Sequence, residues 1–174
     1  MDAIRVAYAD PPYVGQAKKH YDSEEVSHPL LLERLEDEYP DGWALSCSSP
    51  SIGYITSILA NMSLFGLLNH YRVMAWVKPF AVFKPNVNPA YAWEPVIVRG
   101  GRKRTREQDT VRDWVSANIT LKRGLAGVKP DTFSYWLFEV LGLSKDDELV
   151  DLYPGSGAVS RAWDDYTASE DSNG

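Results

Sequence analysis

Short apolar segments and longer segments with helical periodicity alternate along this chain. Five short segments rich in β-branched, aromatic and other apolar residues predict buried strands, because such residues fill a pleated surface that packs on a core. These segments are residues 4–9, 43–47, 73–77, 94–98 and 149–153. Pro95 lies near the start of the fourth, which is typical of an edge strand or of strand entry.

The segments between these strands carry apolar residues at helical spacing. From Ile52 onward, Ile55, Leu59 and Met62 form one apolar face, and Gly66 or Asn69 ends the predicted helix. The other predicted helices are residues 29–39, 133–141 and 158–166. Strands that alternate with helices predict an α/β fold with helices on both faces of a largely parallel sheet.

The length of 174 residues supports one domain, which we place at residues 1–166, followed by a disordered acidic tail at 167–174. A single cysteine and three scattered histidines exclude a disulfide framework and a four-ligand metal site, so no metal is expected. We recognise no signal peptide and no convincing membrane span, and these features predict a cytoplasmic protein.

Charge is distributed unevenly along the chain. The net charge of −6 argues against a general nucleic-acid coat, since phosphate binding needs a basic surface. Residues 99–106 nevertheless carry five positive charges in eight residues. This basic loop predicts contact with nucleic acid at one place, and a solvated surface loop is the alternative.

Two predicted strands are followed by residues that are typical of ligand-binding sites, at the edge where parallel sheets bind ligands. The first ends at Asp10-Pro11-Pro12-Tyr13, where prolines lack N–H donors and leave carbonyl acceptors beside a carboxylate and an aromatic ring. That combination suits a planar group held through its amino hydrogens. The last strand ends at Gly155-Ser156-Gly157, a turn that favours a nucleotide-like cofactor or is simply a tight turn. We expect both ends to face one shared crevice.

Both strand ends resemble motifs of one enzyme family. Asp10-Pro11-Pro12-Tyr13 resembles the catalytic motif of amino-group DNA methyltransferases that use S-adenosylmethionine (SAM), the DPPY motif. Residues 151–157 resemble that family's cofactor loop, Asp-x-Phe-x-Gly-Ser-Gly, and Lys129-Pro130 resembles the start of the helix before the cofactor strand. The motif order is that of circularly permuted members, and the resemblance covers most of residues 4–165.

The resemblance implies a fold and a set of site residues. The fold is a Rossmann-like methyltransferase sheet, circularly permuted, in three α/β/α layers. Part of the cofactor-side sheet is expected to be missing, because only 17 residues follow Gly157. Asp10, Pro11, Pro12 and Tyr13 are the implied catalytic residues, with Tyr13 stacked on a base that has left the duplex. The implied cofactor residues are Lys129, Asp131, Thr132, Asp151, Tyr153, Gly155, Ser156 and Gly157. Substrate-contact candidates are Lys18, His20, Arg102, Lys103 and Arg104.

The function that these motifs predict is SAM-dependent methylation of an exocyclic amino group, adenine N6 in DNA. Asp rather than Ser at position 10 favours adenine over cytosine N4. One alternative is a catalytically weak methyltransferase-like subunit or nucleic-acid-binding protein, whose cofactor pocket is completed by a partner chain or a second copy. Another keeps the chemistry and moves the substrate to RNA, a protein glutamine or a small metabolite.

Overall fold

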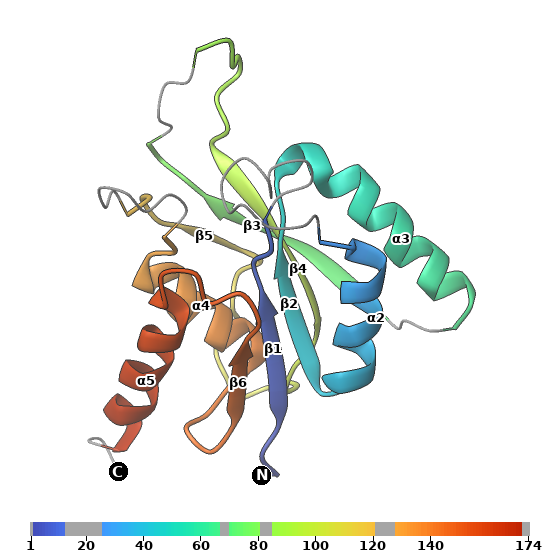
Figure 1. Ribbon diagram of the computed structural model, residues 1–174. Coiled ribbons are helices and arrows are strands. Elements are labelled where there is room, and N and C mark those ends of the chain that lie inside the picture. The colour runs from blue at the N-terminus through green and yellow to red at the C-terminus, as the bar shows by residue number, and fades with distance from the viewer. Residues whose placement is uncertain (1, 13–25, 67–69, 81–84, 121–127, 172–174) are drawn as a thin grey trace.

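The computed structural model describes residues 2–12, 26–66, 70–80, 85–120 and 128–171 (Figure 1). Within them six strands form one sheet. The strands are β1 (Arg5–Ala9), β2 (Gly42–Ser46), β3 (Tyr71–Val77), β4 (Trp93–Gly100), β5 (Trp114–Ser116) and β6 (Glu148–Asp151). The helices are α2 (His28–Glu38), the short 3-10 helix η1 (Ser49–Ser51), α3 (Ile52–Leu64), α4 (Asp131–Leu141) and α5 (Ala158–Asp171).

The sheet has the strand order β5-β3-β4-β2-β1-β6, and all but one of these strands point the same way. β1 is parallel to both β2 and β6, and β3 is parallel to β5, whereas β4 is antiparallel to β2 and β3. The predicted largely parallel sheet is therefore confirmed, with β4 as the exception.

β4 is an interior strand, so the edge-strand interpretation of Pro95 is wrong, whereas the strand-entry interpretation agrees with its place as the third residue of β4. β4 pairs with β2 on one side and β3 on the other. The Pro95 carbonyl accepts a hydrogen bond of 3.1 Å from the Cys47 backbone, and Cys47 comes directly after the end of β2. The Pro95 nitrogen, which carries no hydrogen, faces the chain beyond the end of β2. Little strand pairing is therefore lost.

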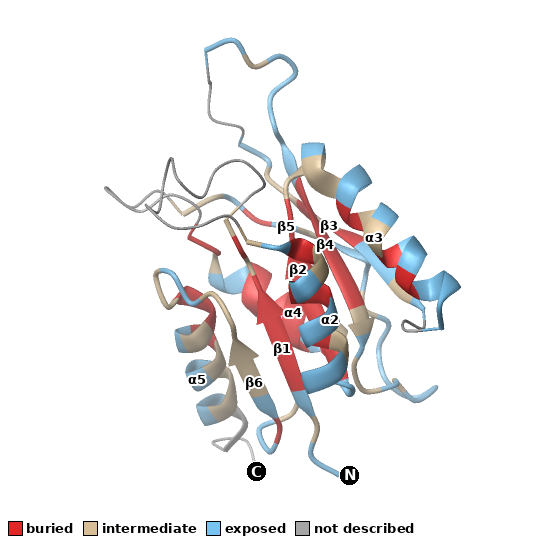
Figure 2. Ribbon diagram, turned by 45° about the vertical axis from the view of Figure 1, so that its right-hand side comes forward, coloured by how far each residue is buried: buried red, intermediate tan, exposed pale blue. Residues whose placement is uncertain are grey.

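Two apolar cores cover the two faces of the sheet. Side chains of β1 alternate between them, with Val6 and Tyr8 in the core under α4 and α5, and Ala7 and Ala9 in the core under α2 and α3. Figure 2 shows β1 buried along most of its length between these layers. The predicted three-layer arrangement is confirmed, and it exposes only the ends and edges of the sheet to ligands.

Two elements differ from the sequence prediction. β5 was not predicted, because its three residues are too short for a periodic pattern; it is held by pairing with β3 and by a 2.9 Å bond from the Trp76 indole to the Ala117 carbonyl. α5 continues to Asp171, beyond the predicted end at Tyr166. Thr167 lies in this extension and donates its hydroxyl to the Trp163 carbonyl at 3.2 Å. Among the described residues, no helix is long and apolar enough to cross a membrane.

Candidate functional site

The carboxyl ends of β1 and β6 lie next to each other at one edge of the sheet. The two strands are parallel and in a register that puts Tyr8 opposite Asp151. The pairing continues beyond β6, because the Leu152 N–H donates to the Tyr8 carbonyl at 2.9 Å. The segments that follow β1 and β6 therefore leave the sheet side by side (Figure 1), and these segments carry Asp10 and the glycine loop. This single pairing brings together two segments, β1 and β6, that are far apart in the sequence.

Asp10 belongs to a network of four charged side chains that connects three strands and the start of α4. The Lys129 ammonium lies 3.0 Å from Oδ2 of Asp10 and also contacts Oε1 of Glu94. Oε2 of Glu94 in turn accepts a 2.8 Å bond from the Lys78 ammonium. Side chains of Glu94 and Lys129 are each 4% exposed, whereas that of Asp10 is 23% exposed. Of the two carboxylates, only Asp10 is partly exposed.

Burial and the neighbouring charges shift the pKa values of these two carboxylates in opposite directions. Burial raises the pKa of Asp10 above its ordinary value, with Lys129 acting against it and the Glu94 charge adding to it. Burial also favours the neutral form of Glu94, but Lys129 and Lys78 outweigh it, so the pKa of Glu94 is lowered. Glu94 is therefore a permanent anion at neutral pH, and Asp10 is the group whose charge responds to its surroundings.

The loop after β6 is shaped by two glycines with left-handed backbone angles. Gly155 has φ 47° and Gly157 has φ 70°, a region that residues with a Cβ rarely adopt. A Cβ at Gly155 would meet almost nothing, so its absence leaves the backbone open to a ligand. Because α5 begins at Ala158, the unpaired N–H groups of its first turn lie at this loop.

Asp151 is fixed at the end of β6 by two local bonds. Oδ2 accepts a 3.2 Å bond from the Ser160 hydroxyl, and Oδ1 accepts a 3.3 Å bond from the Tyr153 backbone. Burial raises the pKa of Asp151, and these two donors oppose that rise. The carboxylate thus ties the strand end to the first turns of α5 and holds the glycine loop between them.

The remaining predicted site residues fall into three groups. Pro11 is buried and Pro12 half-buried next to Asp10, while Asp131 and Thr132 are exposed in the first turn of α4, just after Lys129. Three predicted contacts lie outside the described residues. They are Tyr13, Lys18 and His20.

The basic loop lies at the opposite end of the sheet. β4 runs antiparallel to its neighbours, so the residues that follow Gly100 lie near the amino ends of β1 and β2. Arg102 forms a two-bond ion pair with Asp147, and Arg104 pairs with Glu139 at 2.6 Å. Lys103 is exposed there. The structure does not bring these three residues to Asp10, and two of them carry structural contacts, so we leave them out of the candidate site.

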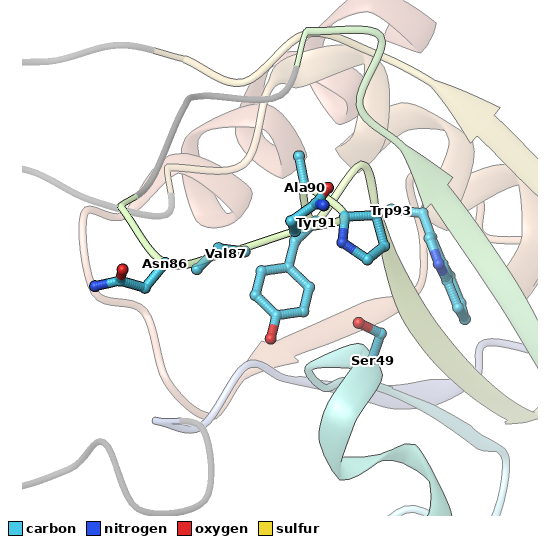
Figure 3. A pocket seen from close by; sticks show the side chains of 8 residues that line it. Ser49, Asn86, Val87, Ala90, Tyr91 and Trp93 are labelled. Atoms are coloured by element: carbon cyan, nitrogen blue, oxygen red, sulfur yellow. The ribbon is translucent and has the colours of Figure 1, made fainter.

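A pocket of about 320 Å³ opens at the same edge of the sheet as Asp10. Ser49, the first residue of η1, and Trp93, the first residue of β4, form part of its wall. The rest comes from the loop that projects at the top of Figure 1. Figure 3 shows the Tyr91 ring extending from this loop toward Ser49. Tyr91 and Trp93 are 51% and 41% exposed, so both rings are available to a planar ligand.

Sequence reasoning missed Glu94, Lys78 and Tyr91. An acidic residue inside an otherwise apolar strand is a signal for Glu94, because such a group is retained in a core only with a partner. Lys78, at the end of the adjacent predicted strand, is the matching cation. Tyr91 had no comparable signal, because loop residues gain their neighbours from tertiary structure alone.

Comparison with known proteins supports the fold. No protein-family model and no curated protein matches this chain. Among solved structures, the M1.HpyAVI–SAM complex is similar with a TM-score of 0.61 and 15% identity, over 94% of this chain and 79% of that one. M1.HpyAVI alone gives a TM-score of 0.57 and 16% identity, over 95% and 78%. At such identities the likeness concerns the fold alone: the chain shares the Rossmann-like α/β fold of these structures.

Proposed function

We propose that this protein is a SAM-dependent methyltransferase that modifies an exocyclic amino group, adenine N6 in DNA. The observation that carries the proposal is the pairing of β1 with β6, which sets an acceptor motif and a glycine loop side by side at one sheet edge. The similarity to a protein solved with SAM supports the choice of cofactor. The circular permutation of the motifs is part of the same proposal and rests on their order along the chain.

The glycine loop fits the methionine and ribose end of SAM. Its two left-handed glycines allow close approach of the backbone, and the first turn of α5 offers N–H donors for a carboxylate. Asp151 and Tyr153 line the same strand end, while Asp131 and Thr132 approach from the start of α4. SAM, when bound, supplies a methyl group on a positively charged sulfur.

Asp10 and Pro11 would hold the amino group that receives the methyl. A carboxylate and a proline carbonyl present only acceptors, so they select a group with two hydrogens to donate. Those hydrogen bonds draw electron density onto an amino nitrogen whose lone pair is otherwise delocalised into its ring, and they aim that lone pair. The N–C bond forms as the S–C bond breaks, and the nitrogen then releases one proton to solvent. The base would reach this position by leaving the duplex, with Tyr13 as its stacking partner.

One topological observation favours a second candidate. β6 lies at the edge of the sheet formed by the described residues, with β1 as its only neighbour there. A further strand that could hold the ribose hydroxyls is therefore absent from the described part of the chain. A methyltransferase-like subunit whose pocket is completed by a second copy or another protein has this arrangement. Calorimetric titration of SAM separates the two: saturable binding to the isolated protein supports the enzyme.

The function is tested by methyl transfer. SAM labelled in its methyl group is incubated with the protein and duplex DNA, single-stranded DNA or RNA of matched sequence, and the nucleosides are separated. The proposal predicts label in N6-methyl-2′-deoxyadenosine from DNA. Label only in RNA would move the substrate, and no transfer to any acceptor despite SAM binding would contradict the proposed enzyme.

Replacement of Tyr91 by alanine is expected to raise the KM for nucleic acid about tenfold with little change in kcat. Stacking of a base on an aromatic ring contributes about 1–3 kcal/mol, and the pocket holds no group of the proposed chemistry. Phe65→Ala is the matched control, since this ring is 78% exposed at the other end of α3. Steady-state kinetics checks the prediction. Equal KM values for nucleic acid in the two variants would show that the pocket does not contact the substrate.

A further inference from the structure

Glu94 is a charged residue in a position that ordinarily holds an apolar one. It is the second residue of β4, is 3% exposed, and precedes the buried run that ends at Val98. An isolated carboxylate there would be strongly unfavourable, and Glu94 is stabilised by two ammonium groups, Lys78 at 2.8 Å and Lys129. The pair of Glu94 and Lys129 is the more deeply buried of the two, and it fixes the position of both side chains.

Lys129 lies between two carboxylates and against two aromatic rings. Its ammonium contacts Glu94 and Asp10, and lies 5.2 Å from the Trp76 ring centre and 5.6 Å from that of Phe133. The side chain is 4% exposed, so this charge is shielded from solvent and acts strongly on its neighbours. Trp76 is itself anchored through its indole to the Ala117 carbonyl. The ammonium therefore has one well-defined place.

The contact with Lys129 distinguishes the two oxygens of Asp10. Lys129 binds Oδ2, and among the described residues no hydrogen bond to Oδ1 is found. The Asp10 carboxylate is thus fixed through Oδ2, and its side chain is still 23% exposed. The charges of Asp10, Glu94, Lys78 and Lys129 sum to zero, so this network of four side chains attracts neither cations nor anions strongly.

We infer that Glu94, acting through Lys129, is a positioning residue that holds the Asp10 carboxylate, through its Oδ2, in place for the substrate amino group. This inference rests on the proposed function and assigns Lys129 to the acceptor side of the site rather than to SAM. Glu94 touches no reacting atom; it sets the place of the ammonium, and the ammonium sets the place and charge of the carboxylate.

The sign of the electrostatic effect can be worked out for each variant. Lys129 favours the charged form of Asp10, and Glu94, Asp151 and the burial of the site disfavour it. Among the described residues, Tyr8 and Cys47 also sense the charge of Asp10. Glu94→Gln removes a negative neighbour and lowers the pKa of Asp10. Lys129→Met removes the positive neighbour and raises it. The change is expected to be about one pKa unit in K129M, whose ammonium lies 3.0 Å from Asp10, and smaller in E94Q, because Glu94 reaches Asp10 only through Lys129.

The test is the acid limb of the pH profile of kcat/KM in these two variants. We expect the limb to move to lower pH in E94Q and to higher pH in K129M, with at least a tenfold loss at neutral pH in both and unchanged SAM affinity by calorimetry. K129R should recover part of the activity that K129M loses, because arginine restores the positive charge at this position. Glu139→Gln, which removes an ion pair at the other end of the sheet, is the control.

A direct readout keeps the inference separate from the proposed function. The carboxyl carbon of Asp10 is titrated by NMR in the wild type, E94Q and K129M. Opposite shifts of the Asp10 pKa support the inference even if no substrate is methylated. Identical Asp10 titrations in the wild type and in folded E94Q, or a large loss of SAM affinity in either variant, would overturn it. If K129M fails to fold, E94Q alone decides.

Discussion

Replacement of Asp10 by alanine reduces methyl transfer by about 10²- to 10³-fold, which is the scale on which removal of one preorganised hydrogen-bonding group slows an enzyme. Asp10 is the partly exposed carboxylate of the network, and Lys129 fixes one of its oxygens at 3.0 Å. Without it, the amino nitrogen keeps its delocalised lone pair and has only the Pro11 carbonyl to orient it. The loss should appear in kcat, because the acceptor acts on the reacting nitrogen.

The fold should survive this substitution, because Lys129 keeps Glu94 as a buried partner. Near-ultraviolet circular dichroism and SAM calorimetry check that the variant is folded and binds its cofactor. Asp10→Asn keeps the size of the side chain and one acceptor oxygen but no charge, and its activity should lie between those of the wild type and D10A. Asp37→Ala on the exposed side of α2 is the control. Full activity in folded D10A would refute the role of Asp10.

Asp147→Asn is expected to lower the free energy of unfolding by about 3 kcal/mol, the scale found when one partner of a buried ion pair is removed. The Asp147 side chain is fully buried and faces Arg102 through both of its oxygens, at 2.7 and 2.8 Å. It also accepts bonds from the backbones of Ile4 and Ser144. This one carboxylate joins the start of β1, the turn before β6 and the segment after β4.

The same substitution carries a pH signature whose sign follows from the pKa of Asp147. Although burial favours its neutral form, the Arg102 guanidinium and the backbone donors outweigh burial and hold this pKa well below the ordinary value of 3.8. A depressed folded-state pKa gives stability that is complete above the unfolded-state value and is lost as the pH falls toward the folded-state value. The wild type should therefore lose its advantage over D147N below about pH 4.

Urea unfolding at pH 7 and at pH 3 measures both effects. Asp113→Asn is the control, because its pair with Arg72 is exposed and such pairs contribute about 0–1 kcal/mol. A difference between D147N and the wild type that is as small as that of the control would contradict the structural role of the pair. A difference that stays constant down to pH 3 would contradict its electrostatic origin.

The strands and helices could be predicted where periodicity is long or where a special residue marks an end. The apolar face of α3 appeared as Ile55, Leu59 and Met62, and all three are buried. Gly142 was predicted to end α4, and it does so with φ 67°. β5 and the final turns of α5 lack such local signals: β5 is held by its pairing with β3, and residues 167–171 carry almost no apolar side chains.

The candidate site was predictable as two motifs but not as a network. Asp10 and the glycine loop could be located because each directly follows an apolar strand. That β1 and β6 are neighbours follows from strand order, which no local pattern encodes. Arg102 illustrates the opposite error: a basic cluster predicts a surface that contacts phosphates, whereas this side chain is largely used inside the protein by Asp147. Charge patterns do not reveal which charges are paired in the fold.

The central claim is that the two strand ends form one SAM site, and backbone amide NMR tests it most directly. SAM is titrated into ¹⁵N-labelled protein, and the shift changes are mapped onto the sequence. We predict that the largest saturable changes occur together at Asp10, at Leu152 and Tyr153, and at residues 155–157. Saturable changes confined to one of these strand ends, or found only around the basic loop at the far end of the sheet, would contradict a shared methyl-transfer site.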